Sequence, residues 1–257
     1  MTELAILDRP SPNIDARDGT VDMLVIHYTG MTSGAAAIER LCDPEARVSA
    51  HYVIEENGAL HRLVREEDRA WHAGVSEWGG RPLLNDCSIG IEMVNPGHEW
   101  GYRDFPEVQM QALETLAQGI VKRWSIPPER VLGHSDIAPR RKDDPGERFD
   151  WPRLARIGLA IWPEAANDPE PGRFLDIEGV MALTRAMVTI GYDIEDFGKA
   201  LTAFRRRFRP DSLRSGSPDN VPVMRDFLIA REVAARYPAA TPIQPGVILD
   251  EFIQEDG

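Results

Sequence analysis

The sequence predicts an α/β domain, in which a central β-sheet is flanked by helices, followed by a small C-terminal domain of three helices. Short apolar, β-rich runs alternate with segments of helical periodicity through the first part of the chain. Residues 167–172 are rich in turn formers and lack periodicity. No β-like run follows them. We therefore expect a domain at 1–166 with an N-terminal arm, a linker at 167–174, and a helical domain and tail at 175–257.

Composition and charge narrow the class of protein. The chain has 257 residues and a formal net charge of −13, which disfavours nucleic acid as a partner because phosphates would be repelled. Its apolar runs are too short to span a bilayer. Cys42 and Cys87 form no motif, so we expect two reduced thiols. Nothing in the composition indicates an oligomeric state.

The first ten residues lack a basic region followed by an apolar stretch, so no secretory signal is visible. We therefore expect a cytoplasmic protein, with the periplasm as the alternative if a signal has been removed.

Residues 1–20 contain turn formers and little periodicity, which predicts an arm over the surface. The run 23–28 is apolar and stops at Thr-Gly, which predicts a strand buried on both faces. His27 lies near the carboxyl end of that strand, where ligands often bind. The alternative is a core histidine whose ring is satisfied by a backbone carbonyl.

A hairpin is predicted next. Residues 34–41 are alanine-rich and expected to be helical. The β-rich runs 49–54 and 60–64 flank an Asn-Gly pair at 57–58, which is a strong hairpin signal. These runs should form a two-stranded ribbon.

Two further segments carry polar side chains in unusual settings. Trp71 and His72 lie in a segment that ends at glycine, and they either wall a ligand cleft or anchor a loop. The run 85–94 predicts a strand, and it places Glu92 between two apolar residues. An unpartnered carboxylate there would be costly. Glu92 therefore has either a partner or a function.

The remaining elements follow from apolar periodicity and turn formers. They are a strand at 130–132 and helices at 106–124, 151–161, 179–190, 193–208 and 218–237. The one concentrated basic feature is Arg205, Arg206 and Arg207 with Arg209. It is either a solvated helix face or a surface for an acidic partner or nucleic acid.

The segment from Gly133 to Trp151 has no apolar periodicity and is rich in chemically active side chains. Asp144 follows His134 by ten residues, and a loop constrained by prolines and glycine can fold the two together. With His27 they would supply three ligands and leave a fourth position open, as in catalytic zinc sites. Glu92 could then serve as the base and Lys142 as the cation for an oxyanion.

Several motifs in order resemble one family. They are Val-Ile-His-Tyr-Thr at 25–29, Val-Ser-Ala-His-Tyr at 48–52, Arg-Ala-Trp-His-Ala-Gly at 69–74, Ser-Ile-Gly-Ile-Glu at 88–92, and the segment from Gly133 to Trp151. The chain resembles, over about residues 9–165, the zinc-dependent N-acetylmuramoyl-L-alanine amidases of the type 2 family, which share a fold with peptidoglycan-recognition proteins. The resemblance implies a central mixed sheet flanked by helices.

The resemblance also implies roles for individual residues. It assigns zinc (Zn2+) to His27, His134 and Asp144, catalysis to Glu92 with help from Lys142, and the muropeptide cleft to Trp71, His72 and Asn85. Residues 191–210 resemble a helical peptidoglycan-binding domain, although Arg205 stands where glutamine is usual. The expected substrate is peptidoglycan or a muropeptide, cleaved between N-acetylmuramic acid, or its 1,6-anhydro form, and L-alanine.

The sequence leaves two rival functions open. A peptidoglycan-recognition protein would bind muropeptides without cutting them, but such binders lack a complete metal set, and Asp144 is present here. A regulator would use the basic C-terminal helix to contact a partner and the first domain only to sense ligand.

Overall fold

The computed structural model describes residues 5–167, 173–214 and 221–239. Within these ranges the main sheet has six strands in the order β1-β5-β4-β9-β3-β10. Their bounds are β1 Ile6–Asp8, β3 Met23–Tyr28, β4 Tyr52–Ile54, β5 Leu60–Arg62, β9 Ser88–Met93 and β10 Val131–Gly133. The pair β4 and β5 is antiparallel, and the other neighbours are parallel. The predicted mixed sheet is confirmed, and so is the hairpin.

The two central strands position the site. Met23 to Ile26 of β3 are fully buried, as expected for a strand covered on both faces. Strand β9 runs parallel to β3 with Glu92 opposite His27 in the register, and β10 runs parallel to β3 on its other side. The carboxyl ends of these three strands therefore meet at one edge of the sheet.

Helices α1 Gly34–Cys42 and α3 Glu107–Trp124 match the predicted segments closely. The apolar stripe of α3, including Leu113 and Ile120, is buried in the core on one face of the sheet. Helix α5 spans Trp151–Arg156 and is shorter than the predicted 151–161. It ends before Gly158, which adopts a positive φ of 75° that only glycine takes readily.

The segment predicted to form an arm over the surface contains two short strands that were not predicted. Ile6–Asp8 forms β1 at the sheet edge, and Ile14–Ala16 forms β2, which pairs antiparallel with β6 Asp68–Ala70. Both strands have only three residues and are largely exposed, so the sequence carries no apolar alternation that would reveal them. A further small hairpin joins β7 Glu77–Trp78 and β8 Arg81–Pro82.

The C-terminal part is helical, as predicted. Its helices are α6 Ile177–Ile190, α7 Phe197–Phe208, α8 Pro210–Arg214 and α9 Met224–Arg236. The short α8 was not predicted, and α7 begins later than expected because the Asp196 side chain caps it. Most of the predicted linker, at 168–172, and the predicted start of the last helix, at 218–220, lie outside the described residues.

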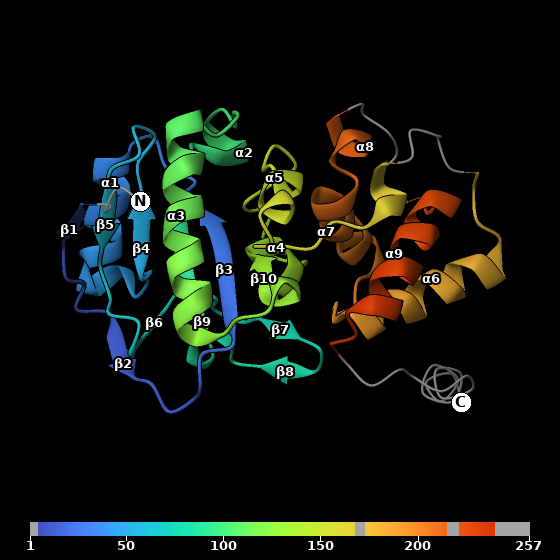
Figure 1. The fold of residues 1–257 in the computed structure, drawn as a ribbon, viewed down its shortest axis with the longest axis horizontal. Helices are drawn as coiled ribbons and strands as arrows, with labels where there is room; N and C mark the ends of the chain where they lie inside the picture. The colour runs from blue at the N-terminus through green and yellow to red at the C-terminus, as the bar shows by residue number, and fades with distance from the viewer. Residues whose placement is uncertain (1–4, 168–172, 215–220, 240–257) are drawn as a thin grey trace.

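The helical part packs directly against the sheet domain, beside β10 and α4 His134–Ile137 (Figure 1). Buried side chains from both parts form one hydrophobic cluster, in which Leu132 and Ile137 join Leu183, Phe204 and Phe208. Burial of apolar surface therefore fixes the helical part to the sheet domain.

The basic run on α7 departs from both expectations. Arg205 and Arg207 are each 2% exposed and pair with buried aspartates, Asp226 and Asp136. They are therefore neither a solvated helix face nor available to an outside partner. Their charges are needed inside because each buried aspartate requires a counter-charge.

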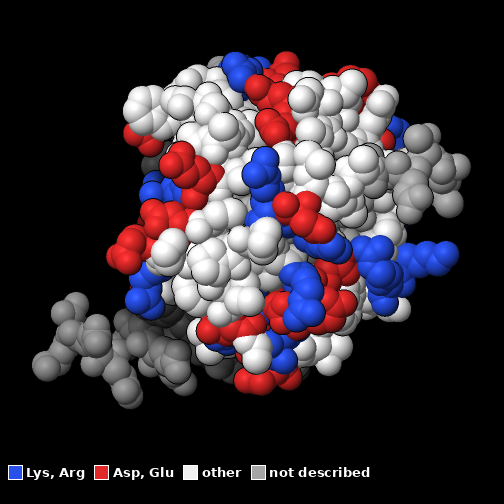
Figure 2. Space-filling view, turned by 90° about the vertical axis from the view of Figure 1, so that its left-hand side faces the viewer, with Lys and Arg blue, Asp and Glu red and all other residues white. Residues whose placement is uncertain are grey.

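Charges of both signs alternate over the face that includes the β1 edge (Figure 2). One pair there is Arg62 with Asp8, whose Nε and Oδ1 atoms are 2.8 Å apart. In the described ranges, no helix has the length and apolar character needed to cross a membrane. Cys42 and Cys87 are both free.

Candidate metal centre

Three side chains that are far apart in the sequence converge at the carboxyl edge of the sheet. The Nδ1 atoms of His27 and His134 are 2.9 Å apart, and each lies 3.1 Å from Oδ2 of Asp144. All three residues are buried. His27 comes from β3, His134 begins α4 directly after β10, and Asp144 lies in the loop that follows.

The loop returns to His134 as its prolines and glycine predicted. The backbone N–H of Ser135 donates to the carbonyl of Asp144 at 2.8 Å, and the N–H of Lys142 donates to Ala138 at 3.0 Å. The single helical turn α4 was not predicted, because four residues are too few to show periodicity.

The second ring nitrogen of His134 fixes the tautomer of its neutral ring. Its Nε2 lies 3.1 Å from the carbonyl oxygen of Ala73. Since a carbonyl only accepts hydrogen bonds, the neutral ring carries its proton on Nε2 and presents the lone pair of Nδ1 to the other two side chains.

A longer chain of hydrogen bonds fixes His27. The hydroxyl of Ser88 donates to the carbonyl of Leu84 at 2.5 Å, so it must accept from Nε2 of His72 at 3.1 Å. Nδ1 of His72 then accepts from Nε2 of His27 at 3.0 Å. Nδ1 of His27 therefore also presents a lone pair. The alternative of a core histidine bound to a carbonyl does not hold for His27.

The protonation states suit a cation. Burial, and then the charge of His134, lowers the pKa of His27 to about 4, so its imidazole is neutral at physiological pH. Burial opposes ionisation of Asp144, but His134 and His27 outweigh it and hold the pKa of this carboxyl well below its usual range. Two imidazoles and a carboxylate are a donor set that zinc accepts.

The distances also fit one zinc ion. Ligand atoms on a tetrahedral zinc lie about 3.4 Å from one another. The separations of 2.9 to 3.1 Å lie within about half an ångström of that value.

Glu92 lies beside this group with an unsatisfied oxygen. Its Oε2 is buried and makes no hydrogen bond to the described residues. Burial, and then the charge of Asp144, raises the pKa of Glu92 to about 8, although Lys142 acts in the opposite direction. The sequence left two explanations for Glu92, a partner or a function. The described residues supply no partner for Oε2, which favours a function.

A cavity of about 380 Å³ opens onto the group, and an adjoining one of about 470 Å³ continues it. His72, His134 and Lys142 line both cavities, and Glu92 and Asp144 line the first. Trp71 lines both as well, while its Nε1 donates to Asp15 at 2.6 Å. Trp71 therefore both walls the cleft and anchors its loop.

Asn85 lines the second cavity and also supports the backbone behind it. Its Oδ1 accepts from the N–H groups of His72 and Ala73 at 3.1 and 2.7 Å. These contacts hold the segment whose Ala73 carbonyl accepts a hydrogen bond from His134.

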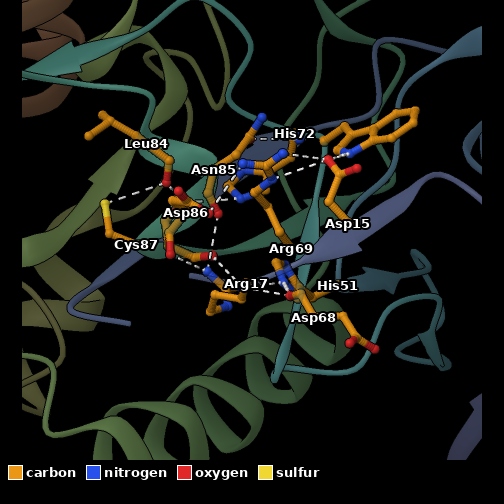
Figure 3. A network of polar contacts seen from close by, with 12 residues as sticks. Asp15, Arg17, His51, Asp68, Arg69, His72, Leu84, Asn85, Asp86 and Cys87 are labelled. Atoms are coloured by element: carbon orange, nitrogen blue, oxygen red, sulfur yellow. Dashed lines mark hydrogen bonds and ion pairs between the residues drawn. The ribbon is translucent and has the colours of Figure 1, made fainter. Parts of the chain in front are cut away.

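Arg17 was missed by the sequence analysis. Its guanidinium donates to the carbonyls of Asn85, Asp86, Asp68 and Ser88, and it meets Nε2 of His51 at 3.0 Å (Figure 3). Arg17 thus links the backbone at Asp68 to the backbone at 85–88, on either side of the segment that carries Trp71 and His72. No sequence signal marked it, because it lies in the segment that lacks periodicity.

Several known proteins are similar to this chain in sequence. The family model described as N-acetylmuramoyl-L-alanine amidase matches residues 17–147. The chain is 36% identical over 223 residues to the N-acetylmuramoyl-L-alanine amidase AmiD of Escherichia coli, covering 77% of this chain and 78% of that protein. It is 38% identical over 163 residues to the 1,6-anhydro-N-acetylmuramyl-L-alanine amidase AmpD of Haemophilus influenzae, covering 56% and 86%.

A solved structure of the Escherichia coli AmiD is also similar to this chain. It is a complex with the substrate anhydro-N-acetylmuramic acid-L-Ala-D-gamma-Glu-L-Lys. Its TM-score is 0.73 at 32% identity, covering 87% of this chain and 93% of that one. Because the family model spans half of the chain and these relatives extend the match, this chain belongs to the N-acetylmuramoyl-L-alanine amidase family.

Proposed function

We propose that this chain is a zinc-dependent amidase that hydrolyses the bond between the lactyl group of N-acetylmuramic acid and L-alanine. His27, His134 and Asp144 would hold the zinc ion. The observation that carries the proposal is the convergence of these three side chains beside Glu92, whose buried Oε2 has no partner in the described residues.

Zinc in such a site lowers the pKa of a water molecule and polarises a carbonyl. Glu92 accepts a proton from the attacking water, and a pKa near neutrality suits it to return that proton to the leaving amine. Because its Oε2 already lacks a partner, Glu92 need break no existing contact at that atom to do so.

Lys142 is the proposed stabiliser of the oxyanion. Its side chain lines both cavities, and within the described ranges it forms no ion pair. An ammonium group that is not already neutralised can oppose the negative charge that develops on the substrate oxygen.

The complete donor set favours an enzyme over a protein that only binds muropeptides. The rival function of a regulator requires basic side chains of α7 that contact an outside partner. Arg205 and Arg207 are buried inside the molecule, which disfavours that function. The relatives named for 1,6-anhydro substrates support an anhydro-muropeptide as the substrate to test first.

The test is mass spectrometry of the products formed from a soluble anhydro-muropeptide and from whole murein. We expect zinc-loaded protein to release an intact peptide with a free L-alanine amino group and a sugar with a free lactyl carboxylate. Cleavage at any other bond, or no cleavage of either substrate by zinc-loaded protein, would reject the proposed reaction.

A further inference from the structure

The helical part makes polar contacts with the segment 131–147, which carries His134, Lys142 and Asp144. The contacts reach this segment at positions before, between and after the two candidate metal ligands. The side chains that make these contacts include three from the loop between α6 and α7 and three arginines that follow it: Tyr192, Asp193, Glu195, Arg206, Arg207 and Arg214.

The deepest contact is a buried node around Asp136. Nη1 of Arg207 lies 2.9 Å from its Oδ2, and the hydroxyl of Tyr192 donates to its Oδ1 at 2.7 Å. Burial, and then Asp136, raises the pKa of Tyr192 well above its usual value, so the hydroxyl keeps its proton. Arg207 and Asp136 are 2% and 1% exposed.

The node reaches His134 through the backbone. Oδ2 of Asp136 accepts from the N–H of Gly133 at 2.8 Å, which holds the turn that begins with His134. Nη2 of Arg207 donates to the carbonyl of Val131 at 2.9 Å. Arg207 therefore holds both sides of His134, at Val131 and at Asp136.

The guanidinium is itself held in place. It stacks over the ring of Trp151, with 4.2 Å between its central carbon and the ring centroid. Trp151 is buried in the core of the sheet domain. The guanidinium of Arg207 is buried and planar, and its two hydrogen bonds fix its orientation. It can therefore transmit the position of α7 to the turn at His134.

A second group of contacts reaches the loop of Asp144. Arg206 lies 2.7 Å from Asp143, the neighbour of Asp144 in the chain. Nη2 of Arg214 donates to the carbonyl of Glu147 at 2.6 Å. These pairs are more exposed than the node, so their individual contributions are smaller.

We propose that the helical part is a clamp on the metal site, in which Arg207 and Tyr192 act through Asp136 as positioning residues for His134. The inference rests on the proposed zinc binding. It implies that zinc affinity depends on side chains of α7 and of the loop after α6, which touch neither the ion nor the cleft. Loss of a group that hydrogen-bonds a metal ligand directly weakens metal binding by about 10- to 100-fold. Because Arg207 acts on His134 through Asp136 and the backbone, the expected effect of its loss is near the lower end of that range.

The test compares two buried arginines on the same helix. Arg207→Met removes the pair with Asp136, whereas Arg205→Met removes an equally buried pair with Asp226 of α9, inside the helical part. Tyr192→Phe is the milder variant, since it removes one hydrogen bond and no charge. The readout is the zinc dissociation constant by competition with a chromophoric chelator, at a temperature where circular dichroism shows each variant folded.

We expect Arg207→Met to weaken zinc binding by about 10-fold and Tyr192→Phe by a smaller factor, with Arg205→Met unchanged. If Arg207→Met does not fold, Tyr192→Phe decides. Wild-type zinc affinity in a folded Arg207→Met protein would overturn the clamp. If that variant does not fold, wild-type zinc affinity in Tyr192→Phe would overturn it. An equal loss in Arg205→Met would also overturn it. A wild-type protein that binds no zinc would instead reject the proposed function.

Discussion

Glu92→Gln is expected to lower kcat by about 10³-fold while the protein still binds one zinc ion. The amide has nearly the shape of the carboxylate but cannot accept a proton from water. Because Glu92 is not among the three converging ligands, zinc content should not change. Steady-state kinetics on a soluble anhydro-muropeptide, with zinc measured on the same sample, provide the check.

The same substitution should stabilise the zinc-free protein at neutral pH. The pKa of Glu92 is raised to about 8 in the folded protein. Between the pKa of the unfolded chain and pH 8, the folded protein therefore keeps this proton and the unfolded chain releases it. The contribution of Glu92 to the free energy of unfolding falls as pH rises through that range. Glutamine does not titrate, so the gain at pH 7 should be about 1–3 kcal/mol.

This stability change separates loss of chemistry from misfolding. The matched control is Glu178→Gln on α6, an exposed carboxylate outside the cleft, which should leave kcat unchanged. Because Glu178 lies in the first turn of α6, this variant should lose less than about 1 kcal/mol of stability. Wild-type turnover in Glu92→Gln would remove Glu92 from the mechanism.

His134→Ala is expected to weaken zinc binding by about 10³-fold or more and to remove activity with it. The substitution takes away one of three ligands and the hydrogen bond that ties this ring to the carbonyl of Ala73. Isothermal titration with zinc, followed by the product assay on the zinc-loaded sample, measures both effects.

His61→Ala is the control for this variant. His61 is also buried, at 5% exposed, but its ring pairs with Glu55 on the hairpin and lies outside the converging group. It should bind zinc as the wild type does. Full zinc occupancy in His134→Ala would reject His134 as a ligand.

The sequence predicted those parts of the fold that local patterns encode. The buried strand predicted at 23–28, the hairpin around Asn57 and the helix predicted at 106–124 each carry their own periodicity or turn chemistry. His27, His134 and Asp144 could be predicted to lie together because a recognisable motif surrounds each of them. Three-residue strands such as β1 carry no such pattern.

Contacts across the fold could not be predicted in the same way. Arg17 and Arg207 bind carbonyls and carboxylates that are distant in the sequence, and nothing in their own neighbourhood marks a buried arginine. His72 was expected to line the cleft, and it also lies in the hydrogen-bond chain that orients His27. The domain limits, the roles of the site residues and the compartment remain predictions.

We propose that distant parts of the chain hold one zinc ion at the edge of the sheet. The decisive experiment is anomalous diffraction from a crystal of zinc-loaded protein, recorded on both sides of the zinc absorption edge. We expect one strong zinc peak bonded to Nδ1 of His27, Nδ1 of His134 and Oδ2 of Asp144. A fully zinc-loaded crystal with its peak elsewhere, or with any of these three atoms unbonded to the ion, would overturn the proposed metal site.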